Sequence, residues 1–239
     1  MLSFLTPTRR RSGLGMAMPA LLLLLAFFVI PVAGLLSRSV TEPTPGLQNY
    51  QALLGSATYL RIFFNTFLVS GIVTLITALI AFPVAWALVI MPQRIAGVVF
   101  AIILLSMWTN LLARTYAWMV LLQQTGLVNR MLMAIGIIEQ PLQLTNNLVG
   151  VTIGMVYIML PFMILPLYGV IKKIDPAILQ AAALCGATKG QALRRVLLPL
   201  ATTGIASGAL MVFVMSLGYF VTPSLLGGTA GQAVVWYTG

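Results

Sequence analysis

Long runs of apolar residues, separated by short polar segments, dominate the pattern of this 239-residue chain. Five runs approach or exceed the roughly 17–25 residues with which an α-helix crosses a lipid bilayer. A lone strand in lipid would leave its backbone polar groups unpaired, so each run is expected to be helical. The pattern therefore predicts an all-α, polytopic transmembrane helical bundle with five visible spans. These spans cover residues 14–36, 65–90, 97–122, 148–170 and 200–221.

The composition narrows the classes of protein that fit this pattern. Hydrophobic residues make up 60% of the chain and charged residues only 7%, against about 25% charged residues in soluble domains. There is no histidine and a single cysteine, Cys185, so neither a zinc cluster nor a catalytic triad can be assembled. The only acids, Glu42, Glu139 and Asp175, form no carboxylate pair, and no phosphate-binding glycine loop is present. We therefore expect no enzyme activity, and no cofactor or metal bound by this chain.

The basic residues indicate how the chain is oriented. The net charge of +10 comes from 13 Lys and Arg against 3 Asp and Glu. These basic residues lie between the apolar runs, which is typical of membrane topology signals and not of nucleic-acid binding. With a cytoplasmic N-terminus, nine of them lie inside, three lie outside, and Arg114 falls within the third span. We therefore expect a multi-pass protein of the bacterial inner (plasma) membrane with its N-terminus in the cytoplasm and no nucleic-acid partner.

Both ends of the chain leave alternatives open. Three arginines precede the first apolar run, as in a signal peptide, whose apolar core is only about 7–15 residues long. Residues 14–36 form a longer run, so we predict a retained first transmembrane helix. Residues 234–239 resemble the start of another apolar stretch. We expect a sixth span that is missing from this sequence, as in a fragment or a truncated product; a protein of five spans is the alternative.

Two regions follow from this layout. Residues 1–60 would hold the N-terminal tail, the first span and an outer loop, and residues 61–239 the main transmembrane domain.

Gly204 and Gly208 form a Gly-x-x-x-Gly pattern that lets another helix approach closely. Residues 126–138 alternate apolar and polar positions and are expected to form an interfacial helix. Three prolines lie inside predicted spans, namely Pro83, Pro161 and Pro166. Proline bends a helix, and these bends either belong to ordinary helix packing or help to shape a gated pathway.

The segment between the fourth and fifth spans, residues 172–199, is too long for a simple turn. Asp175 followed by Pro176 is typical of an N-cap with proline at the first helical position. The Ala- and Leu-rich residues 177–185 favour a helix. Gly186 can adopt the left-handed conformation that ends one. The segment therefore begins with a predicted short helix and a tight turn.

A second short helix is predicted directly after that turn. Thr188 with Gln191 three residues later forms a capping box. The helix carries Arg194 and Arg195 and is expected to end near Pro199, where the fifth span begins. Residues 172–199 should thus form a helical hairpin at the cytoplasmic membrane surface.

The residues of this hairpin resemble a motif of the integral membrane subunits of binding-protein-dependent ABC importers. The family motif is Glu-Ala-Ala, three residues, Gly, nine residues, Ile, one residue, Leu-Pro. This chain keeps the spacing throughout, with Gln180 in place of Glu and Val196 in place of Ile. The Gln removes a charge but keeps hydrogen-bonding groups. The matching residues, expected to couple the chain to an ATPase, are Gln180, Ala181, Ala182, Gly186, Val196, Leu198 and Pro199.

Further segments resemble the spermidine/putrescine permease branch of that family. They are Asn65-Thr66, taken to open the second span, residues 114–118 in the third, and residues 218–223 at the end of the fifth. The resemblance implies a type I ABC importer permease fold, in which the first hairpin helix docks into a groove on a cytoplasmic ATPase subunit. It also implies that ATP and Mg bind that partner, and that a second permease subunit and an extracytoplasmic solute-binding protein complete the importer. Polyamine is the implied substrate; other small cations, amino-acid-like solutes, opines and metal chelates remain open.

Polar side chains inside spans usually face a bundle interior, and the aromatic ones offer cation–π faces to an ammonium substrate. An aromatic belt at the membrane interface is the alternative for such residues. Arg114 is expected to snorkel near the outer interface or to contact a docked binding protein, with a gate charge as the alternative. The predicted pathway residues are Asn65, Trp108, Asn110, Tyr116, Tyr157 and Tyr219.

One other function class stays open. A stand-alone secondary carrier or channel for a small cation would also be a polytopic helical protein. Ion-coupled carriers usually need acidic residues inside their spans, and the predicted spans contain none. The sequence therefore favours the importer subunit.

Overall fold

The computed structural model describes residues 9–42 and 45–227, with side chains from residue 17 onward, and this part of the chain is helical without strands. The chain divides after Leu60 into two compact units, residues 1–60 and 61–239.

The first unit is built on one long apolar helix. Its segments are α1 (Arg9–Leu24), a π-helical turn η1 (Leu25–Val29) and α2 (Ile30–Thr41). The stretch Ala17–Thr41 is long and apolar enough to cross a membrane. The first predicted span is therefore confirmed as a helix, but it continues past residue 36 to Thr41.

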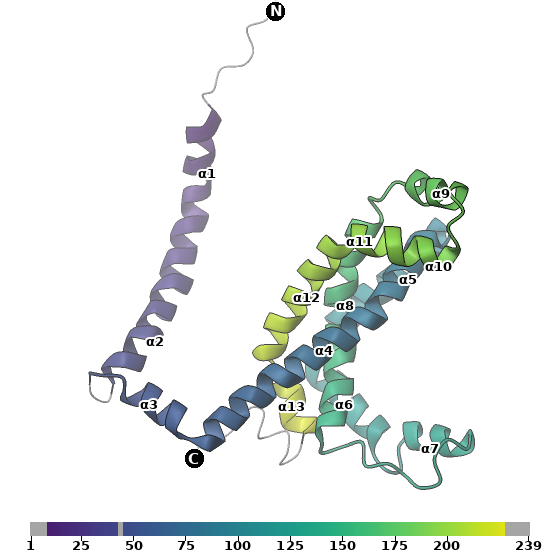
Figure 1. Ribbon diagram of the computed structural model, residues 1–239. Helices are drawn as coiled ribbons and strands as arrows, with labels where there is room; N and C mark the ends of the chain where they lie inside the picture. The colour runs from purple at the N-terminus through teal and green to yellow at the C-terminus, as the bar shows by residue number, and fades with distance from the viewer. Residues whose placement is uncertain (1–8, 43–44, 228–239) are drawn as a thin grey trace, which may run out of the picture. The chain divides into compact units, whose positions relative to one another are not determined.

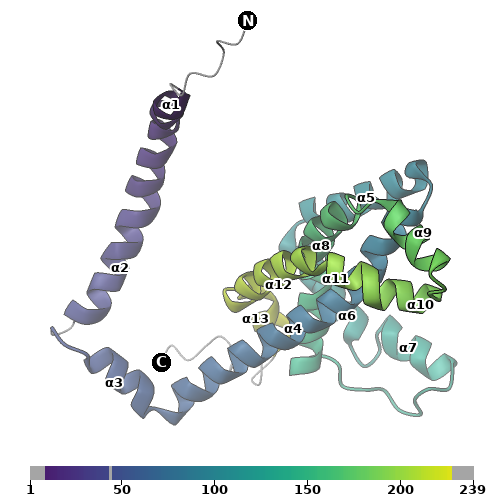
Figure 2. The ribbon, with the colours of Figure 1, turned by 45° about the horizontal axis from the view of Figure 1, so that its top comes forward.

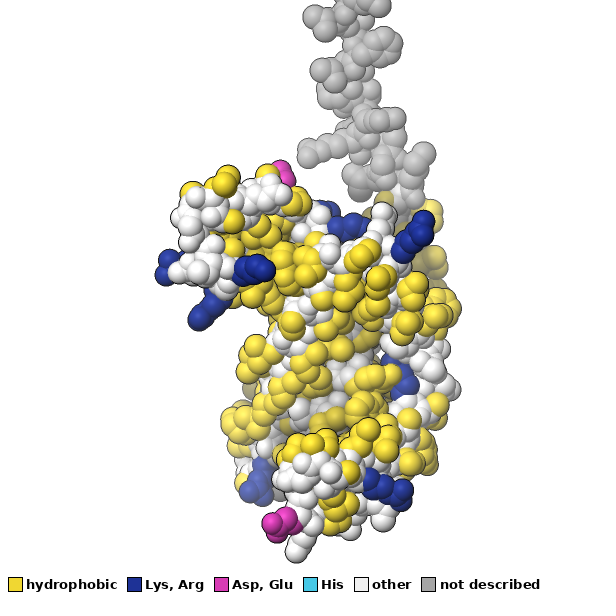
Figure 3. Space-filling view, turned by 90° about the vertical axis from the view of Figure 1, so that its right-hand side faces the viewer, with side chains coloured by type: hydrophobic (Ala, Val, Ile, Leu, Met, Phe, Trp, Pro, Cys, Tyr) yellow, Lys and Arg dark blue, Asp and Glu magenta, His cyan; other side chains and the backbone are white. Residues whose placement is uncertain are grey.

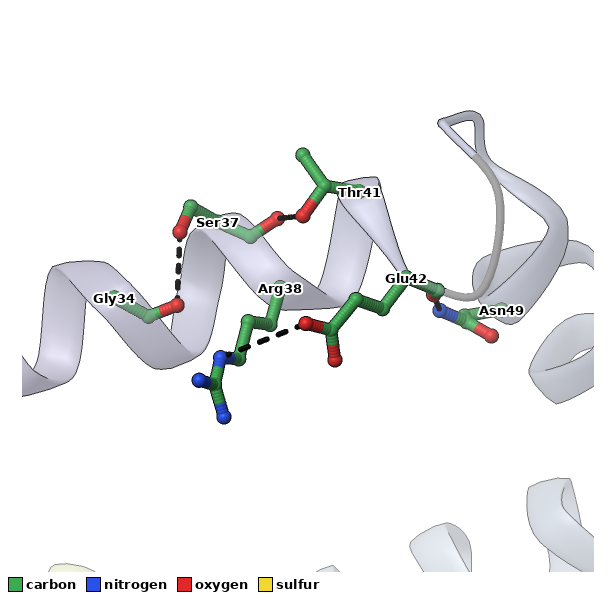
Figure 4. Close-up of polar contacts among 6 residues, drawn as sticks. All are labelled: Gly34, Ser37, Arg38, Thr41, Glu42 and Asn49. Atoms are coloured by element: carbon green, nitrogen blue, oxygen red, sulfur yellow. Dashed lines mark hydrogen bonds and ion pairs between the residues drawn. The ribbon is translucent and has the colours of Figure 1, made fainter.

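Polar contacts hold the turn that follows α2 and leads into the short helix α3 (Gln48–Gly55). The side-chain amide of Asn49 donates hydrogen bonds to the backbone oxygens of Ser39 (2.9 Å) and Glu42 (2.7 Å). Arg38 and Glu42 form an exposed ion pair at 3.7 Å, one helical turn apart (Figure 4). Because these groups are exposed, the ion pair contributes little to stability, and the Asn49 amide is the stronger restraint.

The second unit is a bundle around a central helix, α8 (Leu148–Ile171). Figures 1 and 2 show α12 lying beside α8, with α4 crossing the bundle. More than half of the most apolar window of α8, 56%, is buried inside the chain. Its buried side chains include Met155, Met159, Met163 and Leu167. The other helices are α4 (Ala57–Ile90), α5 (Gln93–Trp108), α6 (Leu111–Leu122), α7 (Leu127–Ala134), α9 (Pro176–Leu184), α10 (Lys189–Ala192), η2 (Leu193–Leu197), α11 (Leu198–Leu200), α12 (Thr202–Leu217) and α13 (Val221–Leu226).

Three continuous helices of the described residues are long and apolar enough to span a membrane, or up to five spans if two bent helix pairs are each one span. The fourth predicted span is confirmed by α8. The second is also confirmed, but its start is wrong, because α4 begins at Ala57. No Gly or Pro interrupts the residues between Ala57 and Asn65, so Asn65 and Thr66 lie within a helix and do not open one.

The third predicted span, residues 97–122, is wrong as a continuous helix. The chain breaks at Thr109 and Asn110, and α5 lies at 101° to the segment Leu111–Ala134. The Asn110 side chain accepts hydrogen bonds from the backbone N–H groups of Leu112 (2.9 Å) and Ala113 (3.4 Å). Asparagine is among the best N-caps, so it starts a new helix inside the apolar run.

The fifth predicted span, residues 200–221, is divided differently from the expectation. A bend of 63° at Ala201 separates Lys189–Leu200 from α12, and α12 ends at Leu217. Pro199 lies just before the bend, where its missing N–H weakens the helical hydrogen bonding. The span is thus joined to the hairpin through this bend.

Close packing of α12 on α8 confirms the expectation for the Gly-x-x-x-Gly pattern. A methyl group at Gly204 would lie 3.0 Å from the Val170 side chain and 3.2 Å from the Leu167 Cα. At Gly208 it would lie 2.6 Å from the Met163 sulfur. Only glycine therefore lets the two helices approach this closely.

Candidate functional site

The hairpin that connects α8 to α12 begins with the predicted N-cap. The Asp175 carboxylate accepts a hydrogen bond from the Ala177 N–H at 2.9 Å, and Pro176 occupies the first position of α9. This cap satisfies one of the free N–H groups at the helix start, and proline there lacks the N–H that would need a partner. The predicted first helix is confirmed, with α9 covering Pro176–Leu184.

Gly186 ends α9 with a left-handed turn. Its φ angle is +83°, a conformation that is costly for residues with a side chain. The Gly186 N–H bonds to the Ala183 oxygen and the Ala187 N–H bonds to the Ala182 oxygen, both at 3.0 Å. These two bonds are those of a Schellman motif. Backbone hydrogen bonds therefore tie Ala182 and Ala183, at the end of α9, to the turn at Gly186.

The second helix starts with the predicted capping box. The Thr188 N–H donates to Gln191 Oε1 at 2.9 Å, and the Gln191 N–H donates to Thr188 Oγ1 at 3.3 Å. Only Ala187 separates this cap from Gly186. The turn between the two helices is thus stabilised on one side by the Schellman motif and on the other by the capping box.

The hairpin has two faces. Gln180 and Ala181 are exposed, Ile178 is 42% exposed and Leu184 is 89% exposed. On the other face, Leu179 and Leu193 are half-buried and pack against the core of the bundle. The hairpin thus has an exposed outer face and an inner face that packs on the bundle.

The last residues of the motif form the elbow into α12. Val196 is half-buried and Leu197 is fully buried, while Leu198 and Pro199 are exposed. Because Leu197 is anchored in the core, the hairpin and α12 are connected without a flexible linker.

Among the described residues, no hydrogen bond or ring contact joins two of the six predicted pathway residues. Asn65 and Tyr219 are half-buried, and Asn110 caps α6. Trp108 is 88% exposed and Tyr116 is 55% exposed, so neither turns into the bundle of this chain. Tyr157 is paired with Trp118, with their ring centroids 5.3 Å apart. Their role in a substrate pathway stays a prediction.

Arg114 lies at the side of the bundle where α13 packs. Its Nε is buried and has no hydrogen-bond partner among the described residues. Its positive charge acts on the Tyr219 hydroxyl. Arg114 is half-buried, so its stem is held by protein instead of extending freely.

Sequence reasoning missed Asn129, a fully buried polar residue of α7. Its amide group donates to the oxygens of Gln123 (3.1 Å) and Leu142 (2.9 Å), and its side-chain oxygen accepts from the Leu142 N–H at 2.8 Å. Asn129 therefore fastens the loop after α7 to the start of that helix. A lone polar residue on the apolar side of the predicted interfacial helix was the available signal.

The geometry defines a class: a polytopic membrane bundle with a rigid helical hairpin at one end and α7 with its loop at the opposite end (Figure 1). Residues 51–238 match the family described as binding-protein-dependent transport system inner membrane component. The match covers most of the chain, and the chain belongs to this family.

Named relatives are similar over much of the chain. The spermidine/putrescine transport system permease protein PotB of Haemophilus influenzae is 38% identical over 182 residues, which is 76% of this chain and 63% of that protein. PotB of Escherichia coli is 35% identical over 76% of this chain and 66% of its own length. The inner membrane ABC transporter permease protein YdcU of Escherichia coli is 34% identical over 80% of this chain and 64% of its own length. The chain thus spans just under two thirds of the length of these curated relatives.

A solved structure supports the fold. It is the crystal structure of a bacterial ABC transporter involved in the import of the acidic polysaccharide alginate, with a TM-score of 0.74. The similarity covers 95% of this chain and 80% of the other, at 21% sequence identity. The permease-type helical bundle predicted from the sequence is confirmed at the level of the fold.

Proposed function

We propose that this chain is the membrane-spanning permease subunit of an ATP-driven ABC importer. The hairpin at residues 172–199 is its coupling element, and the ATPase is a separate cytoplasmic subunit that binds ATP and Mg. A second permease subunit completes the pathway, and an extracytoplasmic binding protein delivers the solute. The N-terminus and the hairpin lie on the cytoplasmic side.

One observation carries this proposal: the motif residues lie on a capped helical hairpin whose outer face is exposed and whose base is buried in the core. Gln180 and Leu184 are exposed on α9, where an ATPase groove would receive them. Leu197 is fully buried at the base. A lever needs both properties, because a partner must grip one end and the bundle must move with the other.

The proposed substrate is a polyamine such as spermidine or putrescine. Two PotB proteins similar to this chain are spermidine/putrescine transport permeases by name. The exposed Trp108 and Tyr116 rings are available to a neighbouring subunit, and aromatic faces attract ammonium groups. With no acid inside the described spans, the choice of solute would rest mainly on the binding protein.

The test is a pair of substitutions at Gly186 in cells that carry the full importer. Gly186→Val forces a β-branched residue into the left-handed conformation, at a cost of about 1–2 kcal/mol or more, and should distort the turn and abolish uptake of labelled spermidine. Gly186→Asn should retain most uptake, because asparagine tolerates this conformation. Membrane insertion is monitored for both variants.

The outcome separates the alternatives. Normal uptake by an inserted Gly186→Val variant that still binds the ATPase would contradict the role of the hairpin. Transport by this chain alone in liposomes, driven by an ion gradient without ATP, would instead support a secondary carrier or channel.

A further inference from the structure

A cavity of about 490 Å³ lies beneath the hairpin, on the face that points away from the exposed Leu184. Leu179 and Ala183 of α9 line one side, Leu193 lines another, and Trp86 and Ile90 from the last turns of α4 close the third. Most of its wall is apolar side chain. A volume of this size accommodates a hydrocarbon chain better than it accommodates ordered water, which needs several polar partners.

The cavity lies where the bilayer surface would fall. Ile90 is the last residue of the 34-residue helix α4, which at 1.5 Å per residue is longer than the hydrocarbon core of about 30 Å. Trp86 lies one turn further in, and tryptophan is enriched at membrane interfaces. An occupant of the cavity would therefore have its apolar part at the depth of acyl chains and its polar part at the headgroups.

The rim of the cavity is basic. Lys189 is exposed and is part of the lining, and Arg194 and Arg195 follow on the same helical segment. Figure 3 shows basic side chains along the edge of the projecting part at the top of the unit, with hydrophobic side chains beneath it. The only acid within residues 172–199 is Asp175, whose carboxylate caps α9. Lys189 is the one charged residue that lines the cavity, and no acid lines it.

Helix stability does not account for Lys189. It is the first residue of α10, where a positive charge opposes the helix dipole. Among the described residues it has no salt bridge or cation–π contact. Lys189 is thus an exposed charge that is available to an anionic group outside the chain.

We infer that this cavity is a binding site for an anionic phospholipid, with one acyl chain between Trp86 and Leu193 and the phosphate at Lys189. Basic pockets between membrane helices bind such headgroups, and the apolar wall explains why the ligand is a lipid and not free phosphate. The inner face of the hairpin would then rest on lipid, while the outer face stays free for a protein partner. This site does not depend on the substrate of the transporter.

Native mass spectrometry of the full-length chain in mild detergent tests the inference, with phosphatidylglycerol and phosphatidylcholine as probes. Lys189→Gln should weaken the affinity for phosphatidylglycerol about fivefold, the effect of one basic residue near an anionic headgroup, and leave phosphatidylcholine unchanged. Gly190→Leu should fill the cavity and reduce binding of both lipids. A side chain at Gly190 meets nothing within 4 Å, and leucine favours a helix over glycine, so the variant should fold.

Two matched variants serve as controls. Lys173→Gln removes an exposed charge near the same surface, and Gly169→Leu adds the same bulk to an exposed helix position where a side chain meets nothing within 4 Å. Both should bind phosphatidylglycerol like the wild type. Equal binding of the two lipids by the wild type, unchanged binding in Lys189→Gln and Gly190→Leu, or displacement of the lipid by millimolar inorganic phosphate would each overturn the inference.

Discussion

The hydroxyl oxygens of Thr115 on α6 and Thr222 on α13 lie 3.4 Å apart, although 107 residues separate them in the chain. The Thr222 methyl group also lies 3.0 Å from where a side chain at Gly154 of α8 would begin. The short helix α13 is thus fastened to two other helices. Because α6 starts at the break in the third span, this contact links that break to the last described helix.

Thr222→Val should destabilise the bundle modestly. Thr115 also donates a hydrogen bond to the Leu111 oxygen at 3.0 Å, and either hydroxyl can be the donor in the contact between the two threonines. Valine keeps the shape but removes the Thr222 hydroxyl, and hydrogen bonds between membrane helices are worth about 0.6 kcal/mol on average, with a maximum of about 1.7. We expect a small fall in the melting temperature in detergent.

A double-mutant cycle isolates the contact. Thr115→Val combined with Thr222→Val should cost less than the sum of the two single changes, because the second removes a partner already lost. Thr152→Val is the control, since its hydroxyl bonds only to the Leu148 oxygen of its own helix. Strict additivity would show that the 3.4 Å contact contributes nothing.

Two glycine-to-alanine changes should have opposite effects on stability. At Gly204 the new methyl would press on the Leu167 backbone at 3.2 Å, and overpacking costs about 1–3 kcal/mol. At Gly169 it meets nothing within 4 Å, so the gain in helix propensity of up to about 1 kcal/mol is realised. Thermal melting should fall for Gly204→Ala and rise or stay level for Gly169→Ala. Equal shifts would mean that α12 can move away from α8 at no cost.

The hairpin was predictable from the sequence because its signals are local. The Asp175 cap, the left-handed Gly186 and the Thr188–Gln191 capping box each act within a few residues, and each appears as predicted. Apolar runs likewise indicated the membrane helices. Hydropathy alone missed the break in the third span. Asn110 lies within an apolar run, and its side chain caps a new helix there instead of letting the first helix continue.

Contacts between distant segments were not predictable from one sequence. Nothing local marks Thr222 as the partner of Thr115, or Leu142 as the partner of Asn129. The same limit applies to the predicted pathway residues, which were chosen by chemistry and depth. Trp108 is 88% exposed in this chain because the break places it at a helix end, and a span assumed to be continuous gave no sign of that.

Asn129→Ala should release the loop that follows α7. The change removes three hydrogen bonds from a fully buried position, and the backbone groups of Leu142 and Gln123 lose the side chain that ties them to α7; each hydrogen bond contributes about 0.5–1.5 kcal/mol. Hydrogen exchange at residues 135–142 should speed up. Gln140→Ala, an exposed change in the same loop, should leave the exchange rates as they are; equal rates in both variants would contradict the anchoring role of Asn129.

Chemical labelling of Cys185 should report which side of the membrane carries the hairpin. It is the only cysteine of the chain and its thiol is free and exposed at the end of α9. If the hairpin is cytoplasmic, a membrane-impermeant maleimide should label inside-out vesicles and leave right-side-out vesicles unlabelled.

The matched control moves the thiol to the other end of the bundle. In a Cys185→Ser background, Gln140→Cys places an exposed thiol in the loop after α7, and the labelling should reverse between the two kinds of vesicle. Addition of the ATPase subunit should protect Cys185 but not the new cysteine, because only Cys185 lies beside the exposed Leu184. Labelling of Cys185 from outside would overturn the proposed orientation, and full labelling in the presence of a bound ATPase would show that the partner grips a different surface.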